Sequence, residues 1–408
     1  MDQSEKLNIL DDVLRIKTVN GNEKAVADYL KELFEKHGIE SEYDKVDENR
    51  FNLIASITKG EGKILGFTGH EDVVATVNDS EWNNDPFEPT HIDGEIFARG
   101  VTDMKGGLVG LAIAMIELNE DEDFHGNIKF IATVGEELGE IGSKQLAKEG
   151  FANDLDALIV GEPSNASSIE TIHKLIQSGL LEVPQPNPTD YGRHSAFCAH
   201  KGSLDYDVIS HGRSAHSSMP QLGINAIDNL VTFYNKEKEY FNTIIGYKDD
   251  ILGNTSPSVT IFDAGDQRNT IPDIATLKGK IRTIPEYDND KIIAGLQKIV
   301  DDLNTSDPKM NLELIIQSSN WPVKTTLDSE FLAEVRSAAK EVLNEDILLV
   351  GAPGGTDASQ FFKENPNLHV VVLGPGNETA HQINEFMEEK DYFDFIEIYK
   401  LIAKNYLK

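Results

Sequence analysis

Several apolar segments of the sequence are predicted to be strands. Side chains that can bind metal ions lie at the ends of these segments or in the loops after them. In chain order these side chains are His70, Asp72, Asp103, Glu136, Glu137, Glu162 and His381. The first two, for example, come directly after the apolar run ILGFTG. Ligands of open α/β sheets collect outside the carboxyl ends of the strands. We therefore expect these side chains to meet at one edge of a sheet.

Each of these residues also has an ordinary structural interpretation. A lone histidine at a strand end is more often a satisfied core or surface residue than a ligand. Asp103 precedes a predicted helix, where an aspartate commonly serves as N-cap. Glu136 and Glu137 would suit a solvated turn, and Glu162 could simply begin one. The recurrence of such residues at the same end of successive strands favours one shared site over separate structural roles.

The chemistry of the set suits a pair of metal ions. Imidazole with carboxylate favours Zn²⁺ and its neighbours, whereas Ca²⁺ and Mg²⁺ prefer oxygen alone. Two metal ions can share a bridging carboxylate, and such a centre acidifies a bound water. A carboxylate that stays off the metals then serves as general base, and adjacent Glu136 and Glu137 can divide these tasks. Asp72 can orient His70, because a ligating histidine usually donates its other N–H to a carboxylate.

The elements that must position these residues alternate between helix and strand in the first part of the chain. Helical spacing of apolar residues and short apolar runs distinguish the two kinds of segment. The predicted helices are 1–17, 23–38 and 104–118, and the predicted strands are 51–57, 63–69, 127–134 and 156–163. This rhythm predicts an α/β fold in which helices flank a mixed sheet.

The rhythm changes near residue 200, where segments of alternating polarity begin. Strands are predicted over 202–212, 258–265 and 275–285, with a helix over 224–241. The α/β pattern returns from about residue 320, with helices at 329–343 and 390–407 and a strand at 369–376. The sequence therefore predicts a catalytic domain made of 1–201 and 318–408, interrupted by a smaller α+β domain over 202–317.

Composition narrows the class of protein. The chain has 408 residues, of which 39% are hydrophobic, so it can bury a sizeable core. Its 37 basic and 70 acidic residues give a formal net charge of −33, which argues against nucleic acid and anionic membranes as partners. The single cysteine, Cys198, fits a reducing compartment. We see no signal peptide and no apolar stretch of about 18 residues, and we expect a cytoplasmic protein.

Motifs along the chain match a known family. They are GHEDVV, DPFEPTHIDGEIFARGVTDMKGG, TVGEELGEIGSK, GEPS, HGRSAHSSMP and GPGNETAHQINE. Together, in this order and over nearly the whole chain, they resemble the M20 family of zinc peptidases and deacylases. The resemblance implies a zinc-exopeptidase-like sheet, with the insertion as a ferredoxin-like lid and dimerisation domain of a homodimer. It also implies two Zn²⁺ ions per subunit, for which Co²⁺ or Mn²⁺ can substitute.

The resemblance assigns a place to each candidate ligand. His70 and Glu162 would bind one zinc ion, and Glu137 and His381 would bind the other. Asp103 would bridge the two ions. These assignments follow from the position of each residue in the family motifs.

The resemblance also assigns the residues that act on the reaction. Glu136 would deprotonate the water and later protonate the leaving amine, and Asp72 would orient His70. His216, in HGRSAHSSMP, would reach the site of the partner subunit and stabilise the tetrahedral oxyanion. The alternative for His216 is a turn histidine ahead of the helix at 224–241.

Carboxylates of a substrate need cations or polar donors around them. Arg282 in KIRTIP and Asn269 in QRNTIP match positions that hold substrate in the family. Lys201 in HKGS is a further candidate, with an ordinary strand-edge lysine as the alternative. Gly355 lies in the glycine-rich turn GGTDA, whose backbone N–H groups at a helix start would suit an anion. These groups could make the site locally positive within an acidic protein.

The resemblance implies a hydrolase that removes an N-acyl group from a small anionic N-acyl amino acid. N-succinyl-LL-2,6-diaminopimelate is the favoured substrate, which would yield succinate and LL-diaminopimelate for lysine synthesis. N-acetylornithine, other N-acyl amino acids and dipeptides are alternatives. A binding protein without turnover is a further alternative, against which the presence of Glu136 argues. The link over 165–199 is longer than in many relatives, and we expect it to form an extra helix and loop that influence substrate choice.

Overall fold

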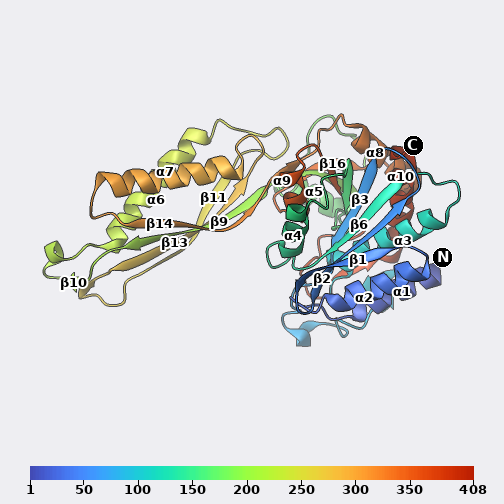
Figure 1. Ribbon diagram of the computed structural model, residues 1–408, viewed down its shortest axis with the longest axis horizontal. Helices are drawn as coiled ribbons and strands as arrows, with labels where there is room; N and C mark the ends of the chain where they lie inside the picture. Colours follow the sequence, from blue (N-terminus) through green and yellow to red (C-terminus); the bar gives the residue numbers. More distant parts are fainter. The chain divides into compact units, whose positions relative to one another are not determined.

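The chain forms two compact units. The computed structural model describes residues 1–408, apart from the side chain of Asp79. The first unit comprises Met1–Ala199, Lys324–Ala352 and Thr356–Lys408, and the second comprises His200–Val323 with Pro353–Gly355 (Figure 1). The second unit runs past the expected boundary at residue 317, because β14 (Leu312–Asn320) pairs with β9 (Gly202–His211) as far as Asn320.

A nine-stranded mixed sheet forms the centre of the first unit. Its strands, in sheet order, are β1 (Ser41–Asp47), β2 (Arg50–Thr58), β6 (Asn127–Thr133), β3 (Ile64–His70), β7 (Ala157–Val160), β17 (His369–Val372), β8 (Ser195–His200) and β15 (Val323–Lys324), with β16 (Leu348–Ala352) paired to β8. The run β6-β3-β7-β17 is parallel, whereas β1 and β2 are antiparallel to their neighbours. The predicted α/β class is confirmed.

The order of these strands decides which loops meet. β2 and β3 follow each other through the turn KGEG, yet β6 lies between them in the sheet. His70 is paired with Thr133 of β6, and Thr68 with Val160 of β7. The carboxyl ends of β3, β6 and β7 are therefore adjacent. Because these central strands are largely buried on both faces, they read as mostly apolar runs rather than as alternating patterns.

Helices cover the sheet of the first unit (Figure 1). They are α1 (Gln3–Arg15), α2 (Lys24–Lys36), α3 (Gly106–Glu120), α4 (Ile141–Glu149), α5 (Ile169–Gln177), α8 (Glu330–Leu343), α9 (Ala358–Glu364) and α10 (Glu389–Tyr406). A Cβ at Gly107 would lie 1.8 Å from the carbonyl oxygen of Gly161, so glycine is required where α3 passes the end of β7. In the described part of the chain, no helix has both the length and the apolarity needed to cross a membrane.

A small three-stranded sheet ties distant loops of the first unit together. It has the order β18 (Phe386–Glu388), β5 (Glu95–Phe97) and β4 (Thr90–Ile92). Two short helical turns, η1 (Asp79–Glu81) and η2 (Val101–Lys105), flank it in sequence. Since β18 follows the loop that carries His381, and β5 precedes the turn that carries Asp103, their pairing brings these two residues close.

The second unit has the ferredoxin-like arrangement that was predicted. Its elements in chain order are β9, α6 (Ala226–Ile244), β11 (Ser256–Ala264), β13 (Ile274–Thr283), α7 (Asn289–Ser306) and β14. The antiparallel sheet has the order β11-β13-β9-β14. Both helices pack their apolar sides on one face of this sheet (Figure 1). A two-stranded ribbon of β10 (Ala215–His216) and β12 (Thr270–Ile271), with the turn η3 (Pro220–Leu222), completes the unit.

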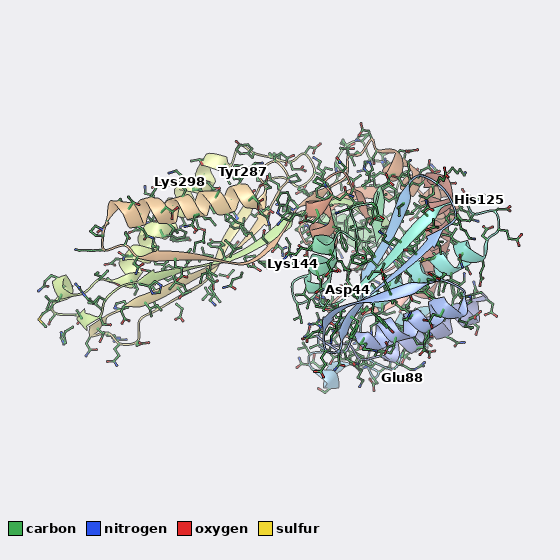
Figure 2. The ribbon with its side chains drawn as sticks, viewed as in Figure 1. Asp44, Glu88, His125, Lys144, Tyr287 and Lys298 are labelled. Carbon is green, nitrogen blue, oxygen red and sulfur yellow. The ribbon has the colours of Figure 1, made fainter. Side chains whose placement is uncertain are left out.

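Charged side chains project from the surface of both units. Glu88 and Lys298, for example, extend outward from the first and the second unit respectively (Figure 2). A net charge of −33 is tolerated because such groups stay hydrated. A buried carboxyl group is the exception that needs explanation.

Glu237 is such a buried carboxyl group, in the core of the second unit. Its side chain on α6 is 2% exposed, and one oxygen accepts a hydrogen bond from the Tyr206 hydroxyl. The other oxygen has no hydrogen-bond partner among the described residues. Burial raises the pKa of Glu237 to about 7. The folded unit therefore holds this proton more tightly than the unfolded chain does.

This difference predicts a pH-dependent stability. Between about pH 4.5 and 7 the unfolding free energy should fall as pH rises, by up to about 3 kcal/mol in total, because ionising Glu237 is harder in the folded unit. Above pH 7 this contribution should be constant. Urea unfolding from pH 5 to 8 measures the slope, which Glu237→Gln should flatten. Exposed Glu239, on the same helix, offers Glu239→Gln as control. An unchanged slope in Glu237→Gln would contradict the assignment.

Candidate metal centre

Two histidines and an aspartate form the middle of the cluster at the carboxyl edge of the first unit's sheet. His70 ends β3 and is buried, Asp103 lies in η2, and His381 lies in the loop after β17. Asp103 Oδ1 is 3.1 Å from His70 Nε2, and Asp103 Oδ2 is 3.1 Å from His381 Nε2. One carboxylate therefore faces both imidazoles with a different oxygen.

Each histidine has a second carboxylate on the same ring nitrogen. Glu162 Oε1, after β7, lies 3.2 Å from His70 Nε2. Glu137 Oε1, after β6, lies 2.7 Å from His381 Nε2. These are the pairs that the motif resemblance implies, with Asp103 between them. The ligand roles themselves stay a prediction.

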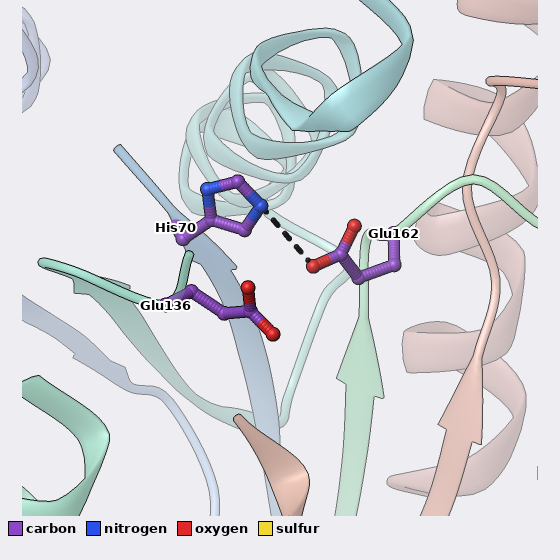
Figure 3. A group of neighbouring side chains, drawn as sticks. All are labelled: His70, Glu136 and Glu162. Atoms are coloured by element: carbon purple, nitrogen blue, oxygen red, sulfur yellow. Dashed lines mark ion pairs between the residues drawn. The ribbon is translucent and has the colours of Figure 1, made fainter. Parts of the chain in front are cut away.

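Glu136 lies beside the pair of His70 and Glu162. Ligand atoms of these three side chains all lie within 4.8 Å of one another, and the carboxylate of Glu136 points toward the space next to Glu162 (Figure 3). Burial raises the pKa of Glu136 well above its usual value; His70 opposes this shift, while the charge of Glu162 adds to it. A carboxyl group with a raised pKa in this position is suited to proton transfer.

Asp72 contacts both the loop of the two glutamates and the ring of His70. Its carboxylate accepts hydrogen bonds from the backbone N–H groups of Glu136, at 3.2 Å, and Glu137, at 3.3 Å. His70 Nδ1 is 2.9 Å from the main-chain oxygen of Asp72 but 3.6 Å from its carboxylate. The main-chain carbonyl is therefore the closer partner of the His70 ring, while the carboxylate lies within ion-pair distance of that ring and also holds the loop that carries the two glutamates.

The charges of this cluster shift one another. Hydrogen bonds to Asp103 and Glu137 raise the pKa of His381 to about 10. Burial, followed by the charge of Asp103, raises the pKa of Glu162 to about 8. Hydrogen bonds to both imidazoles lower the pKa of Asp103 despite its burial. The site thus concentrates negative charge that only cations or protons can balance.

Glu385 supports the cluster and was not found from the sequence. It is fully buried, and one oxygen accepts from the backbone N–H of Thr102 at 2.8 Å and of Asp103 at 3.0 Å. Its other oxygen accepts from Gly100 N–H at 3.0 Å and from the Arg99 guanidinium. Glu385 therefore fixes the turn that carries Asp103. Only its place four residues after His381 hinted at this role, and many exposed glutamates share such spacing.

The candidate substrate residues lie in the second unit, at two opposite ends of its sheet. Arg282 is paired with Ser203 at the start of β9, and Lys201 Nζ donates to Asn254 O at 2.7 Å in the same region. His216 lies on the ribbon of β10 and β12, which follows the far end of β9, and Asn269 directly precedes β12. β9 is ten residues long, so its two ends are separated by about 30 Å.

The remaining candidate, Gly355, belongs to the short segment Pro353–Gly355 that clusters with the second unit. The helix start expected at GGTDA is that of α9, which begins at Ala358, the last residue of the motif. The exposed His216 has Ser218 as its near neighbour, with Oγ 2.8 Å from its Nδ1. The structure thus places these residues in one unit but does not test their contacts with substrate.

The long link over 165–199 forms the extra helix that was expected, α5. Ile172 of α5 and Leu181 pack on Leu348 and Val350 of β16. The backbone N–H of Ser167 donates to Glu378 at 2.8 Å. Glu378 lies in the same loop as His381, so this link contacts the loop that carries a candidate ligand.

Known proteins resemble this chain in both sequence and structure. Residues 66–405 match the peptidase family M20/M25/M40. A probable succinyl-diaminopimelate desuccinylase of Staphylococcus aureus is 36% identical over 100% of this chain and 98% of its own length. The structure of an M20 metallo-carboxypeptidase from Sulfolobus solfataricus matches with a TM-score of 0.76 at 20% identity, covering 100% of this chain and 99% of that one.

A further solved structure, a dinuclear metal-binding M20 peptidase from Bacillus subtilis, covers 99% of this chain and 98% of its own at 16% identity, with a TM-score of 0.65. At these identities the structural matches establish the fold. The match to the family and the full-length similarity to the desuccinylase also establish the family and the class of reaction. The chain belongs to peptidase family M20/M25/M40 and is a hydrolase that acts on an amide bond.

Proposed function

We propose that this protein is a two-zinc hydrolase that cleaves N-succinyl-LL-2,6-diaminopimelate into succinate and LL-diaminopimelate. The observation that supports the metal centre is the position of Asp103, whose two oxygens face two histidines that each have a second carboxylate. Two imidazoles with carboxylates fit Zn²⁺, and Co²⁺ or Mn²⁺ can use the same donors. The negative charge of the clustered carboxylates would also attract such cations.

Residues near the metal centre would transfer the proton and hold the catalytic loop. When bound, the two ions would polarise the scissile carbonyl and acidify a water molecule. Glu136 lies outside both histidine–carboxylate pairs, so its carboxylate can accept a proton from water and pass it to the leaving amine. The water oxygen joins the acyl carbon, the C–N bond breaks, and the proton completes the amine. Asp72 holds the backbone of Glu136 and Glu137 during these transfers.

The substrate assignment rests on relatives and on charge. The Staphylococcus aureus relative is named a probable desuccinylase, and a protein of Wolbachia pipientis with the same activity in its name is 28% identical over 97% of this chain and 91% of its own length. N-succinyl-diaminopimelate carries several carboxylates. Arg282 and Lys201 supply cations for them, with Asn269 and the turn at Gly355 as polar partners. A cytoplasmic location fits the single, buried Cys198.

A homodimer through the second unit is part of this proposal. Arg282 of β13 lies beside the start of the ten-residue strand β9, and His216 of β10 follows its far end, so one copy of the unit cannot bring both to the same small substrate. A second copy could supply His216 to the site that uses Arg282. The edge strand β11 exposes Ile261 and Phe262, and an exposed apolar edge is a natural surface for pairing between copies.

A comparison of substrates tests the proposed activity. We expect kcat/KM for N-succinyl-LL-diaminopimelate to exceed that for N-acetylornithine, N-acetylmethionine and a dipeptide by about 100-fold, or about 2.7 kcal/mol in transition-state binding. Each substrate is measured on zinc-loaded protein with and without a chelator, and the chelator should remove the activity. A flat profile, or preference for a dipeptide, would reject the substrate while keeping the hydrolase. Turnover that resists the chelator would reject the metal centre.

A further inference from the structure

The loop of residues 134–142 (the 134–142 loop) runs from the end of β6 into the first turn of α4 and carries Glu136 and Glu137. It turns through Gly135 at a φ of 65° and Glu140 at a φ of 60°. Such left-handed positions are unfavourable for a residue with a side chain, as at Glu140, so the loop depends on contacts that hold it from outside. Asn52 supplies one such contact, because it accepts from Val134 N–H at 2.9 Å and donates to Gly142 O at 3.3 Å.

Asp357 supplies a second contact from a distant part of the chain. One carboxylate oxygen accepts a hydrogen bond from the hydroxyl of Thr133, the last residue of β6. The other oxygen accepts from the hydroxyl of Ser143, in the first turn of α4, at 2.5 Å. The carboxylate is 2% exposed. A single buried side chain therefore joins both ends of the loop.

Asp357 stands at the start of α9 but does not cap that helix with its side chain. Asp357 is the N-cap of α9, where an aspartate usually accepts from a backbone N–H of the first turn and stabilises the helix by about 1 kcal/mol. Here its side chain makes no such bond with any described residue. The hydroxyl of Thr356 lies 3.3 Å from Ala358 N instead. The carboxylate of Asp357 is thus directed to the loop rather than to its helix.

A second residue of α9 contacts the same loop. Gln360 Nε2 donates to Glu140 Oε2 at 2.9 Å, and both side chains are buried. The contacts from α9 thus reach Thr133, Glu140 and Ser143. These lie before, within and after the turn that presents Glu136. Neither Asp357 nor Gln360 lies in the metal-ligand groups around His70.

We propose that Asp357 is a positioning residue that holds the 134–142 loop from α9 and thereby places Glu136 for proton transfer. The role in proton transfer rests on the proposed function, whereas the mechanical link between α9 and the loop stands on the hydrogen bonds alone. If the link is released, the loop should become more mobile. A misplacement of a catalytic group by about 1 Å can lower a rate by about 100-fold.

The test combines hydrogen exchange with kinetics on full-length protein at saturating zinc. In Asp357→Asn, we expect amides of 134–143 to exchange at least about tenfold faster, while those of 369–372 stay as in the wild type. The kcat per folded molecule, for the best amide of the substrate series, should fall about 10- to 100-fold. KM should stay within about threefold. Ser143→Ala should show the same pattern with smaller size, and it carries the test if Asp357→Asn does not fold.

A matched control is available at Thr325, which, like Ser143, is a buried hydroxyl residue of the first unit. Its hydroxyl lies 2.8 Å from Val370 O in β17. In Thr325→Val, amide exchange should rise over 369–372. Amide exchange over 134–143 and kcat per folded molecule should stay as in the wild type. Wild-type exchange of the loop in both Asp357→Asn and Ser143→Ala would overturn the link. A mobile loop with unchanged kcat would overturn the positioning role. Absence of turnover in the wild type would reject the proposed function, and exchange would still decide whether Asp357 holds the loop.

Discussion

Replacing Glu136 with glutamine is expected to lower kcat by about 10²- to 10⁴-fold while both metal ions stay bound. Glutamine keeps the shape of the side chain but cannot take a proton from water. The two histidine–carboxylate pairs, His70 with Glu162 and His381 with Glu137, remain intact in this variant. The measurements are kcat on the preferred amide and the number of metal ions per chain.

The control for this variant is Glu149→Gln, an exposed glutamate at the end of α4, which should keep normal kcat. Two outcomes would oppose the assignment of Glu136 as base. Near-normal turnover would mean that another group accepts the proton. Loss of a metal ion would mean that Glu136 is a ligand, a real alternative because its carboxylate lies within 4.8 Å of ligand atoms of His70 and Glu162.

Mixing two impaired variants is expected to raise activity above that of either one if the site is shared between subunits. His216→Ala removes the proposed oxyanion donor and should lower kcat about 100-fold or more. Arg282→Ala removes a cation from the substrate carboxylates and should lower kcat/KM at least about tenfold. In a mixed dimer, one site would contain Arg282 from one chain and His216 from the other, and would be intact.

Random exchange of subunits makes half of the dimers mixed, and half of the sites in those are intact. Activity should therefore recover to about a quarter of the wild-type value. The control is a mixture of His216→Ala with the double variant His216→Ala/Arg282→Ala, which has no intact combination and should stay inactive. If the first mixture also stays inactive while native mass spectrometry shows mixed dimers, the two residues do not serve one shared site.

Several features of the site could be predicted from the sequence because they depend on local pattern. Apolar runs such as ILGFTG mark buried strands, and the polar residues directly after them fall at strand ends. His70, Glu137 and Glu162 were found in this way, and the parallel run β6-β3-β7 brings them to one edge. The types of these residues also indicate the class of metal.

Other features depend on contacts between residues that are far apart in the chain. Glu385 binds the turn of Asp103, and Asp357 binds Thr133 and Ser143. In the sequence, both look like ordinary acidic residues of polar loops. Their burial and their hydrogen-bond donors arise only when the strands and helices pack, so spacing along the chain does not distinguish them from exposed acidic residues.

The order of strands is a further feature that local pattern does not contain. The turn between β2 and β3 is short, yet β6 separates them in the sheet. The helix α7 and the strand β14 of the second unit were likewise not predicted, although the turn from one to the other is short. Which strand pairs with which is decided by the burial of whole faces, to which many distant residues contribute.

For this protein, the sequence alone determined the α/β class, the inserted ferredoxin-like unit, the family and the set of candidate ligands. The α/β class and the candidate ligands follow from residue types and short-range periodicity, whereas the family and the ferredoxin-like form of the insertion follow from the resemblance of the motifs. Only the tertiary structure decided that Asp103 faces both histidines, that the carboxylate of Asp72 also holds the loop of Glu136, and that Asp357 joins both ends of that loop. Hydrogen bonds have strict limits of distance and angle, so partners are selected by the final packing and not by their separation along the chain.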